Sequence, residues 1–334
     1  MIKQAYEDLS KINLLDFSKK SVLIIGAGYI AREYAIALSK LKISDVTILG
    51  KSKKNLEKFK EFSNFKIIAG GYEKNLSKIK KKDLVIITTP IQELMNATKK
   101  VIENGYDRIL IEKPGSIFKN DLIELEQLIK KQKVRIGYNR FFYPSFHKLK
   151  LLSDNDGGIT SCKFDFTEWL HTIGVEKLDN EICKRWGISN SLHVISMALE
   201  LIGMPKEMNS FQSGKLEWHP TGSIFVGSGI SQKKIPFSYH ANWGGGGRWG
   251  IEVVTKSNIY RLIPLEKLFV SKKDSIEWKE VHLQPAFSNV KVGIAEEIAA
   301  MLNYKLSKKI GMTTVNDAIK FNEIAEKIFG YKIK

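Results

Sequence analysis

Residues 21–41 read SVLIIGAGYIAREYAIALSKL, and this stretch decides the fold. Val22 to Ile25 form an unbroken apolar run, which is typical of a strand buried on both faces of a parallel sheet. A glycine turn follows, and Ile30 to Leu41 repeat apolar residues at helical spacing. The segment DVTILG at 45–50 predicts a second strand, so residues 21–50 are expected to form a βαβ unit.

The alternation of strands and helices continues to about residue 140. Strands are expected in KIIAG (66–70), DLVIITTP (83–90), RILIEKP (108–114) and VRIGYN (134–139), with helices near 92–104 and 119–131. Strands that alternate with helices in this way predict a parallel sheet with right-handed crossovers. We therefore expect residues 1–140 to be a doubly wound Rossmann domain.

From residue 141 the pattern changes to period-2 polarity, which favours antiparallel strands with one face in water. The strand segments are SCKFDFTEWL (161–170), GSIFVGSGIS (222–231), IPFSYHANW (235–243), GIEVVTKSNIYRLI (250–263) and SIEWKEVHL (275–283). Helices are expected near 144–152, 189–203, 295–306 and 315–330. Residues 141–334 are thus predicted to be an α+β domain with a mostly antiparallel open sheet. We expect it to bind the substrate and to associate into a homodimer or homotetramer.

Composition restricts the class of protein. The 334 residues carry a net charge of +17, from 53 Lys and Arg against 36 Asp and Glu. Only seven basic residues are arginine, and the lysines are spread along the chain, which favours a Lys-rich surface over a nucleic-acid binder. Two cysteines without a CxxC spacing predict neither disulfides nor a metal site. Without a signal peptide or a membrane-length apolar run, we expect a cytoplasmic protein.

The glycine turn carries the strongest functional signal. Gly26, Gly28 and Ala31, with Tyr29 and Ile30 between them, match GxGxxA between a strand and a helix. The glycines let the backbone approach a pyrophosphate at the helix N-terminus, and Ala31 permits close packing. The alternative is a glycine turn in an α/β protein that binds no nucleotide.

The end of the second predicted strand bears on cofactor choice. NAD-binding sites place an Asp or Glu there to bind the ribose hydroxyls. Here Lys51 and Ser52 take that place, and a lysine and a hydroxyl favour a 2′-phosphate. We therefore expect NADP(H), with NAD(H) as the second choice. The alternative is a solvated turn.

Two further strand ends place polar residues at the same edge of the sheet. Thr88, Thr89 and Pro90 end one strand, and Glu112 and Lys113 end the next. Doubly wound sheets bind ligands along this edge. A partly desolvated lysine beside a nicotinamide can exchange a proton with a substrate oxygen, so Lys113 is the candidate acid/base. The alternative is a surface lysine before a turn.

These motifs resemble the Gfo/Idh/MocA family of sugar and cyclitol oxidoreductases. The resemblance rests on GAGYIA, TTP, EKP, and GYNRFFYPSFHKLK at 137–150, and it extends through Trp186 to Gly203. It implies that Lys113 lies near the reacting substrate carbon and that Asn139 and Arg140 lie in the cofactor and substrate cleft. Residues 242–268 look similar to members of the bacterial surface-polysaccharide and sugar-nucleotide type.

The resemblance also implies a role for His193. The family commonly has Asp-x-x-x-His-x-x-Asp on the helix that enters the second domain. This chain keeps the histidine but has Ser189 and Ser196 in the aspartate places. His193 is expected to assist Lys113 or to bind a substrate hydroxyl, whereas a helical histidine taken alone is more often structural.

Other side chains are candidate substrate contacts, with ordinary packing as the alternative for each. Aromatic faces stack on sugar rings and arginine binds anionic groups. These candidates are Arg140, Tyr143, Arg185, Trp186, Asn190, Trp243 and Arg248.

The function expected from these features is hydride transfer between NADP(H) and a secondary alcohol or ketone of a sugar-like, possibly anionic, substrate such as a nucleotide sugar. One alternative is an imine or unsaturated-ring reductase. Another is a non-catalytic NADP(H) sensor or scaffold.

Overall fold

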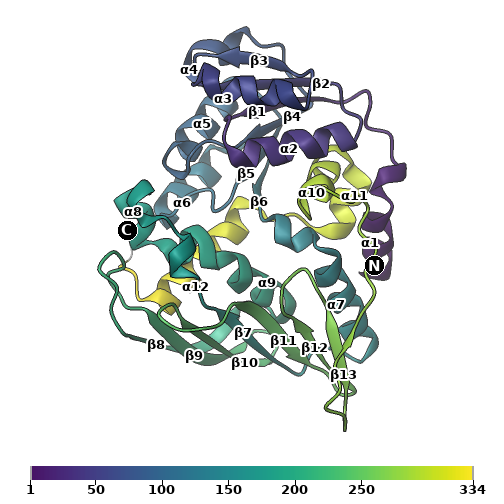
Figure 1. Ribbon diagram of the computed structural model, residues 1–334, viewed down its shortest axis with the longest axis vertical. Helices are drawn as coiled ribbons and strands as arrows, with labels where there is room; N and C mark the ends of the chain where they lie inside the picture. The colour runs from purple at the N-terminus through teal and green to yellow at the C-terminus, as the bar shows by residue number, and fades with distance from the viewer. Residues whose placement is uncertain (1, 333–334) are drawn as a thin grey trace. The chain divides into compact units, whose positions relative to one another are not determined.

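The strand β1 (Ser21–Ile25) lies inside a six-stranded parallel sheet in the computed structural model, which describes residues 2–332 (Figure 1). The strand order is β3-β2-β1-β4-β5-β6, with Val22 of β1 paired with Val46 of β2 and with Leu84 of β4. The other strands are β2 (Asp45–Gly50), β3 (Lys66–Ala69), β4 (Leu84–Ile87), β5 (Arg108–Glu112) and β6 (Lys133–Gly137). The expected doubly wound Rossmann sheet is confirmed.

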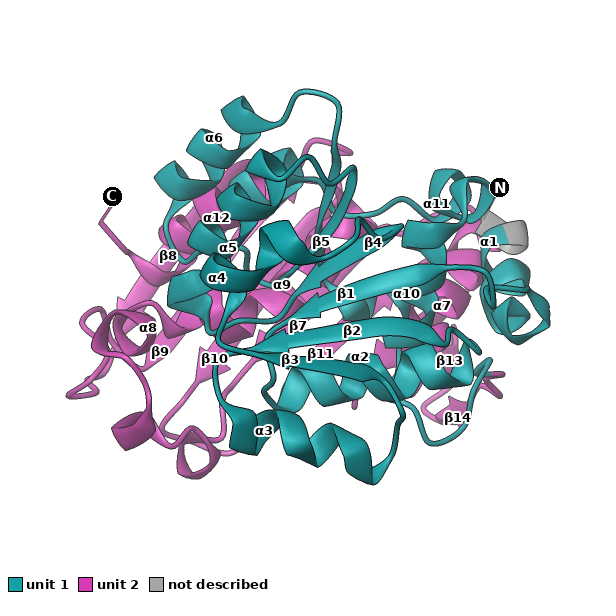
Figure 2. Ribbon diagram, turned by 90° about the horizontal axis from the view of Figure 1, so that it is seen from above, with its two compact units in different colours: residues 1–142, 285–319 teal, residues 143–284, 320–334 magenta. Residues whose placement is uncertain are grey.

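Helices cover both faces of this sheet. Figure 2 shows α2 (Tyr29–Lys40) and α3 (Lys53–Glu57) on one face, with α5 (Ile91–Glu103) and α6 (Lys119–Leu128) on the other. Each helix buries its apolar stripe against the strands; in α5 the buried residues include Leu94, Ala97 and Val101. The central strands β1 and β4, covered on both faces, consist almost wholly of buried aliphatic residues.

The chain divides into two compact units, coloured separately in Figure 2. The first unit holds residues 1–142 and 285–319, and the second holds residues 143–284 and 320–334. Residues 285–319 return to the first unit because α10 (Ile294–Leu302), which is buried along its whole length, packs against α2. The helix α11 (Tyr304–Ile310) contacts α1 (Ile2–Ser10). The sequence-based boundary at residue 140 did not include this return.

The second unit is built on an eight-stranded sheet with the order β14-β13-β12-β11-β7-β10-β9-β8. Only β7 and β10 pair in parallel, so the expected mostly antiparallel sheet is confirmed. Its strands are β7 (Ser161–Phe166), β8 (Pro205–Ser213), β9 (Ile224–Ser231), β10 (Pro236–Asn242), β11 (Trp249–Val254), β12 (Asn258–Leu262), β13 (Phe269–Lys272) and β14 (Lys279–Glu280).

The remaining helices complete the two units. They are α4 (Tyr72–Asn75), α7 (Pro144–Asn155), α8 (Asn180–Lys184), a π-helix (Gly187–Ser191), α9 (Leu192–Ile202) and α12 (Val315–Phe329). The helix α9 packs on β7 and β11. Within residues 2–332, no helix is long and apolar enough to cross a membrane.

Candidate active site

The turn after β1 requires glycine at Gly26. Its φ of 124° lies in the region that L-residues with side chains rarely adopt. A Cβ at Gly26 would lie 2.5 Å from the carbonyl oxygen of Thr88, which follows β4. The Thr88 hydroxyl donates to the Ile25 carbonyl at 3.1 Å, so the ends of β1 and β4 are tied together.

Gly28 leaves open space where a side chain would otherwise stand. No atom lies within 4 Å of the position of its Cβ, and it is the N-cap residue of the 12-residue helix α2 with no side-chain cap. The N–H groups of the first turn of α2 are thus available to an anionic group. This arrangement fits the pyrophosphate of a dinucleotide.

This turn lies at the point where the order of the strands reverses. β2 and β3 lie on one side of β1, whereas β4, β5 and β6 lie on the other. Ligands of doubly wound sheets bind outside the carboxyl ends of the strands at such a point. Thr89 lies there, and its hydroxyl oxygen is buried without a hydrogen-bond partner among the described residues. This polar atom fits contact with a bound nucleotide.

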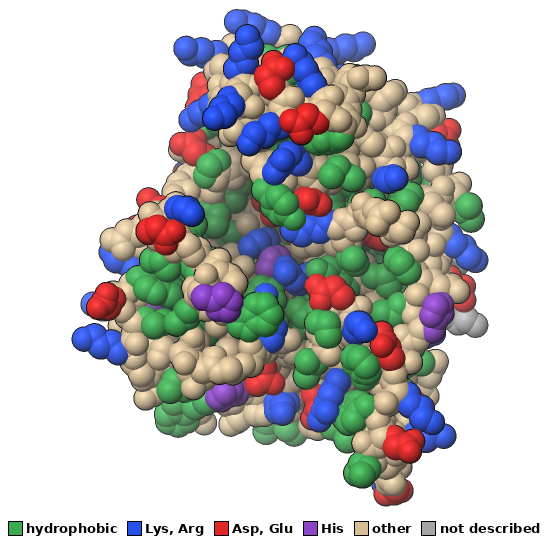
Figure 3. All heavy atoms as spheres, viewed as in Figure 1, with side chains coloured by type: hydrophobic (Ala, Val, Ile, Leu, Met, Phe, Trp, Pro, Cys, Tyr) green, Lys and Arg blue, Asp and Glu red, His purple; other side chains and the backbone are tan. Residues whose placement is uncertain are grey.

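Lys51 and Ser52 lie where the sequence places them, directly after β2. The Ser52 hydroxyl caps α3 by accepting from the Asn55 backbone N–H at 3.3 Å. The exposed Lys51 ammonium lies 3.7 Å from a carboxylate oxygen of Glu73. Lys53 and Lys54 are also exposed, and Figure 3 shows lysine and arginine side chains gathered over this part of the first unit.

Lys113 follows β5, the strand next to β4, and its side chain is partly buried. Burial raises the pKa of the neighbouring Glu112, whereas Lys113 and the Tyr34 hydroxyl oppose that rise. Tyr34 Oη lies 2.9 Å from Glu112 Oε1 and 3.0 Å from Glu297 Oε2. Sequence reasoning missed Tyr34 and Glu297, because nothing in α2 or in the distant α10 marks their meeting.

Asn139 and Arg140 begin the short 3₁₀ helix Asn139–Phe142 after β6. The Asn139 side-chain amide donates to the Val292 carbonyl at 3.0 Å, which ties β6 to the returning segment 285–319. The ammonium of Lys291 in that segment lies 5.1 Å from the ring centroid of the exposed Tyr29. Burial lowers the pKa of Lys291, and the nearby Arg140 adds to that effect.

In the second unit, His193 lies on α9 directly after the π-helix. Its side chain is buried, and its ring centroid lies 5.9 Å from that of Trp249. Ser189 and Ser196 are uncharged, and their hydroxyls donate to the carbonyls of Trp186 and His193. π-Helical turns inside helices often mark functional sites.

A buried carboxylate that sequence reasoning missed lies beside this helix. Glu168 accepts hydrogen bonds from the Ser191 hydroxyl at 2.5 Å and from the Asn190 side-chain amide at 3.0 Å. Its Oε2 also lies 3.9 Å from Nη1 of Arg248. Two residues after β7, Glu168 gives no signal in sequence because it follows an ordinary alternating strand.

Arg248 lies between two aromatic rings. Its guanidinium carbon is 4.5 Å from the ring centroid of Trp169 and 4.7 Å from that of Trp249. The side chains of Arg248 and Trp169 are 40% and 45% exposed, respectively. The stacking orients the guanidinium while leaving part of it open to an anionic ligand.

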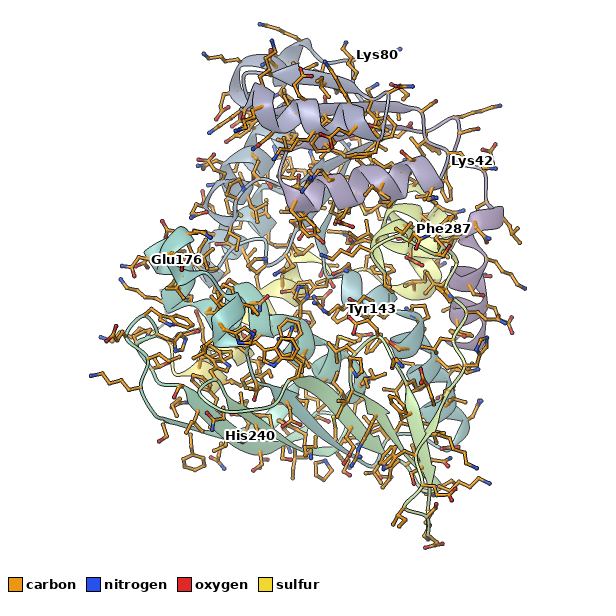
Figure 4. All side chains as sticks on the ribbon, in the orientation of Figure 1. Lys42, Lys80, Tyr143, Glu176, His240 and Phe287 are labelled. Carbon is orange, nitrogen blue, oxygen red and sulfur yellow. The ribbon has the colours of Figure 1, made fainter. Side chains whose placement is uncertain are left out.

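Other predicted substrate contacts are engaged inside the second unit. The buried Trp243 donates from its indole nitrogen to the Phe166 carbonyl at 3.2 Å and stacks on Trp218. Arg185 forms a buried ion pair with Glu326 at 2.6 Å. Tyr143, labelled in Figure 4, is buried with its hydroxyl 3.4 Å from Glu266. Trp186 contacts Trp218 edge to face.

Comparison with known proteins finds a family model that matches part of the first unit. Residues 20–140 match the model of the GFO_IDH_MocA oxidoreductase family, which has an NAD-binding Rossmann fold. A comparison with curated proteins finds no significant match.

Solved structures share the fold of nearly the whole chain. UDP-N-acetylglucosamine 3-dehydrogenase GnnA from Acidithiobacillus ferrooxidans is 12% identical with a TM-score of 0.73, covering 93% of this chain and 97% of that one. An oxidoreductase from Agrobacterium radiobacter, solved with NAD+, L-tartaric acid and magnesium, is 12% identical with a TM-score of 0.74, covering 94% and 96%. A putative NADPH-dependent oxidoreductase from Desulfitobacterium hafniense is 18% identical with a TM-score of 0.74, covering 91% and 93%.

The resemblance drawn from GAGYIA, TTP and EKP is thereby confirmed. Residues 20–140 are similar to the NAD-binding Rossmann domain of the Gfo/Idh/MocA oxidoreductase family.

Proposed function

We propose that this protein transfers hydride between NADP(H) and a secondary alcohol or ketone of a sugar or nucleotide-sugar substrate. Lys113 is the proposed acid/base, and His193 assists it. The observation that carries the proposal is the position of Lys113 at the carboxyl end of β5, in the same sheet as the glycine turn after β1. The names of the structural neighbours, which include a UDP-sugar dehydrogenase, support the substrate class.

The cofactor would supply the hydride donor or acceptor. Gly26 and Gly28 would hold its pyrophosphate against the first turn of α2, and Thr88 and Thr89 would line the nicotinamide side. Lys113 would protonate or deprotonate the substrate oxygen whose carbon exchanges hydride. Lys113 and the neighbouring Glu112 interact electrostatically, and a carboxylate beside a lysine favours the protonated lysine that would donate.

The preference for NADP(H) rests on Lys51 and Ser52, supported by the lysines of α3. A 2′-phosphate brings additional negative charge, and Lys51 is the cation directly at the end of β2. Glu73 competes for the Lys51 ammonium. We therefore expect Lys51→Ala to weaken NADPH binding about tenfold with little change for NADH, and Glu73→Gln to strengthen NADPH binding.

In the second unit, the proposed substrate contacts are His193, Asn190 and Arg248. Arg248 is exposed between its two aromatic neighbours and suits the phosphate of a nucleotide sugar. Glu168 holds Asn190 through a hydrogen bond, so the amide has a fixed orientation.

The protein is further proposed to work in the cytoplasm as a homodimer or homotetramer through the sheet of the second unit. Phe211 of β8 and Ile230 of β9 are 66% and 44% exposed, which supports self-association through these strands. Light scattering tests this, and a monomer at micromolar concentration would contradict it.

A turnover assay tests the proposed hydride transfer. Purified protein is mixed with NADPH or NADP+ and a panel of keto-sugars, sugars and nucleotide sugars, and the nicotinamide absorbance is followed. Turnover with a member of the panel is expected. Tight NADPH binding without any absorbance change across the panel would support a non-catalytic binding protein instead.

A further inference from the structure

A hydroxyl and two carboxyl groups from distant parts of the chain meet within the first unit, and one of them belongs to Glu112, the residue before Lys113. Tyr34 of α2 is fully buried, and its hydroxyl oxygen lies 2.9 Å from Glu112 Oε1 and 3.0 Å from Glu297 Oε2. Glu297, on α10, is also fully buried. Gly137 of β6 closes the site, because a Cβ there would lie 3.2 Å from the Tyr34 hydroxyl. We name Glu112, Tyr34 and Glu297 the carboxyl–tyrosine cluster.

The number of protons in this cluster follows from its geometry. Both distances are hydrogen-bond distances, and each hydrogen bond needs one hydrogen. The Tyr34 hydroxyl has a single hydrogen and satisfies one carboxylate only. The second contact therefore requires a hydrogen from the other carboxyl group. Two ionised carboxylates this close in the protein interior would also repel each other strongly.

The surroundings show which carboxyl group holds the extra hydrogen. Two cations, Lys113 and Lys291, interact electrostatically with Glu112. Both favour the ionised form of the Glu112 carboxyl group. The carboxyl groups of Glu112 and Glu296 both disfavour the ionised form of Glu297. Burial, with these two carboxyl groups, raises the pKa of Glu297 well above its usual value.

Both acidic and basic side chains surround the carboxyl–tyrosine cluster. Glu33 and Glu112 favour the charged form of Lys291. Arg140 disfavours that charged form. On α10, burial raises the pKa of Glu296 to about 7. Glu296 is also buried on α10, and it serves as the matched control for Glu297.

We propose that the carboxyl–tyrosine cluster carries one stored proton on Glu297 and one negative charge on Glu112. Glu297–H donates to Tyr34 Oη, and the Tyr34 hydroxyl donates to Glu112. Glu297 is thus a positioning residue: it keeps Tyr34 aimed at Glu112 and fixes a single negative charge beside Lys113. The effect on Lys113 rests on the proposed function, whereas the stored proton does not.

The stored proton is tested by the pH dependence of unfolding. The folded protein holds a proton on Glu297 that the unfolded chain loses above its ordinary pKa, so rising pH favours unfolding. The unfolding equilibrium constant of the wild type should rise about tenfold per pH unit relative to Glu297→Gln, which has no such proton. Glu296→Gln is the control, and its difference from the wild type should stop growing above about pH 7. If the Glu297→Gln and wild-type curves stay parallel from about pH 5 to 8, the proposal is wrong.

A measurement on the wild type covers the case in which Glu297→Gln does not fold. At about pH 8.5, exposed carboxyl groups and Glu296 are ionised, so a carboxylic-acid C=O band in the infrared spectrum would come from a deeply buried acid. The band is expected in the wild type and in Glu296→Gln. Its absence in the wild type would overturn the proposal.

The link to Lys113 needs a third comparison, on the alkaline limb of the kcat/KM profile. Glu112→Gln removes the negative charge beside Lys113 and should move this limb to lower pH. Glu297→Gln keeps that charge and should leave the limb in place. A shift of equal size in both variants would contradict the charge assignment. If no substrate turns over, the unfolding and infrared results still decide whether the proton is stored.

Discussion

Glu168 Oε1 lies 2.5 Å from Ser191 Oγ, and this contact fastens the loop after β7 to the π-helix that precedes His193. The second carboxylate oxygen accepts from the Asn190 amide, so both oxygens are occupied by donors of the same turn. A carboxylate accepts at both oxygens, whereas a glutamine presents one acceptor and one donor.

Glu168→Gln replaces one acceptor oxygen with an NH2 group, so it loses or reverses one of these two hydrogen bonds in a buried site. The free energy of unfolding should fall by about 1–3 kcal/mol, which urea titration measures. The exposed Glu207 of β8 offers a matched control, and Glu207→Gln should change stability by less than about 0.5 kcal/mol. Equal stability of the two variants would show that the Glu168 contacts do not hold the π-helix.

Gly26 and Gly28 give opposite predictions although they are two residues apart. Gly26→Ala places a Cβ 2.5 Å from the Thr88 carbonyl oxygen at a φ of 124°, so it should cost about 1–3 kcal/mol of stability. Gly28→Ala meets no protein atom and should change stability by less than about 1 kcal/mol. It should nevertheless weaken NADPH binding at least about tenfold, because the methyl group occupies the phosphate space. Unchanged NADPH affinity in a folded Gly28→Ala variant would argue against pyrophosphate binding at this turn.

Arg185 is paired with Glu326 in the interior of the second unit, with both side chains almost fully buried. Arg185→Met leaves the Glu326 carboxylate without its partner and should cost about 3–5 kcal/mol of unfolding free energy. The double variant Arg185→Met/Glu326→Met removes both charges and should recover most of that loss. Calorimetry of the three proteins checks this. A single variant as stable as the wild type would leave Arg185 available for a role in substrate binding.

His219 predicts loss of stability in acid. Its Nδ1 lies 2.9 Å from the Gly222 carbonyl oxygen and its Nε2 lies 2.6 Å from the Tyr331 hydroxyl, so Nδ1–H donates and Nε2 accepts. Burial lowers the pKa of His219 from 6.5 to about 4. The unfolded chain therefore takes up a proton first, and about 3 kcal/mol of stability should be lost between pH 6.5 and 4. His219→Gln should flatten this part of the stability profile, and an unchanged slope would exclude His219 as its source.

The Rossmann fold was predictable because each of its elements has a local signal. The aliphatic strands β1 and β4, the glycine turn and the amphipathic α5 all follow from hydrophobic pattern and turn chemistry. The edge strand β8 was missed because its burial does not alternate regularly and many of its residues are exposed. The return of α10 to the first unit was missed because nothing local tells which distant helix a buried helix packs against.

The candidate site was predictable only where motif and strand end coincide. Gly26, Thr88 and Lys113 lie at the expected strand ends. The partners that fix the charges of the site were not predictable. Tyr34 meets Glu297 across 263 positions of sequence, and Glu168 meets Ser191 across 23, and neither pair has a characteristic spacing.

Lys113 is proposed to exchange a proton with the substrate while hydride moves to or from the cofactor. The decisive measurement is single-turnover nicotinamide absorbance with a substrate found in the panel, for the wild type and Lys113→Met. The variant should bind NADPH within about threefold of the wild type and lose a factor of about 10²–10⁴ in the rate of hydride transfer. A Lys113→Met variant that transfers hydride at the wild-type rate would contradict the account.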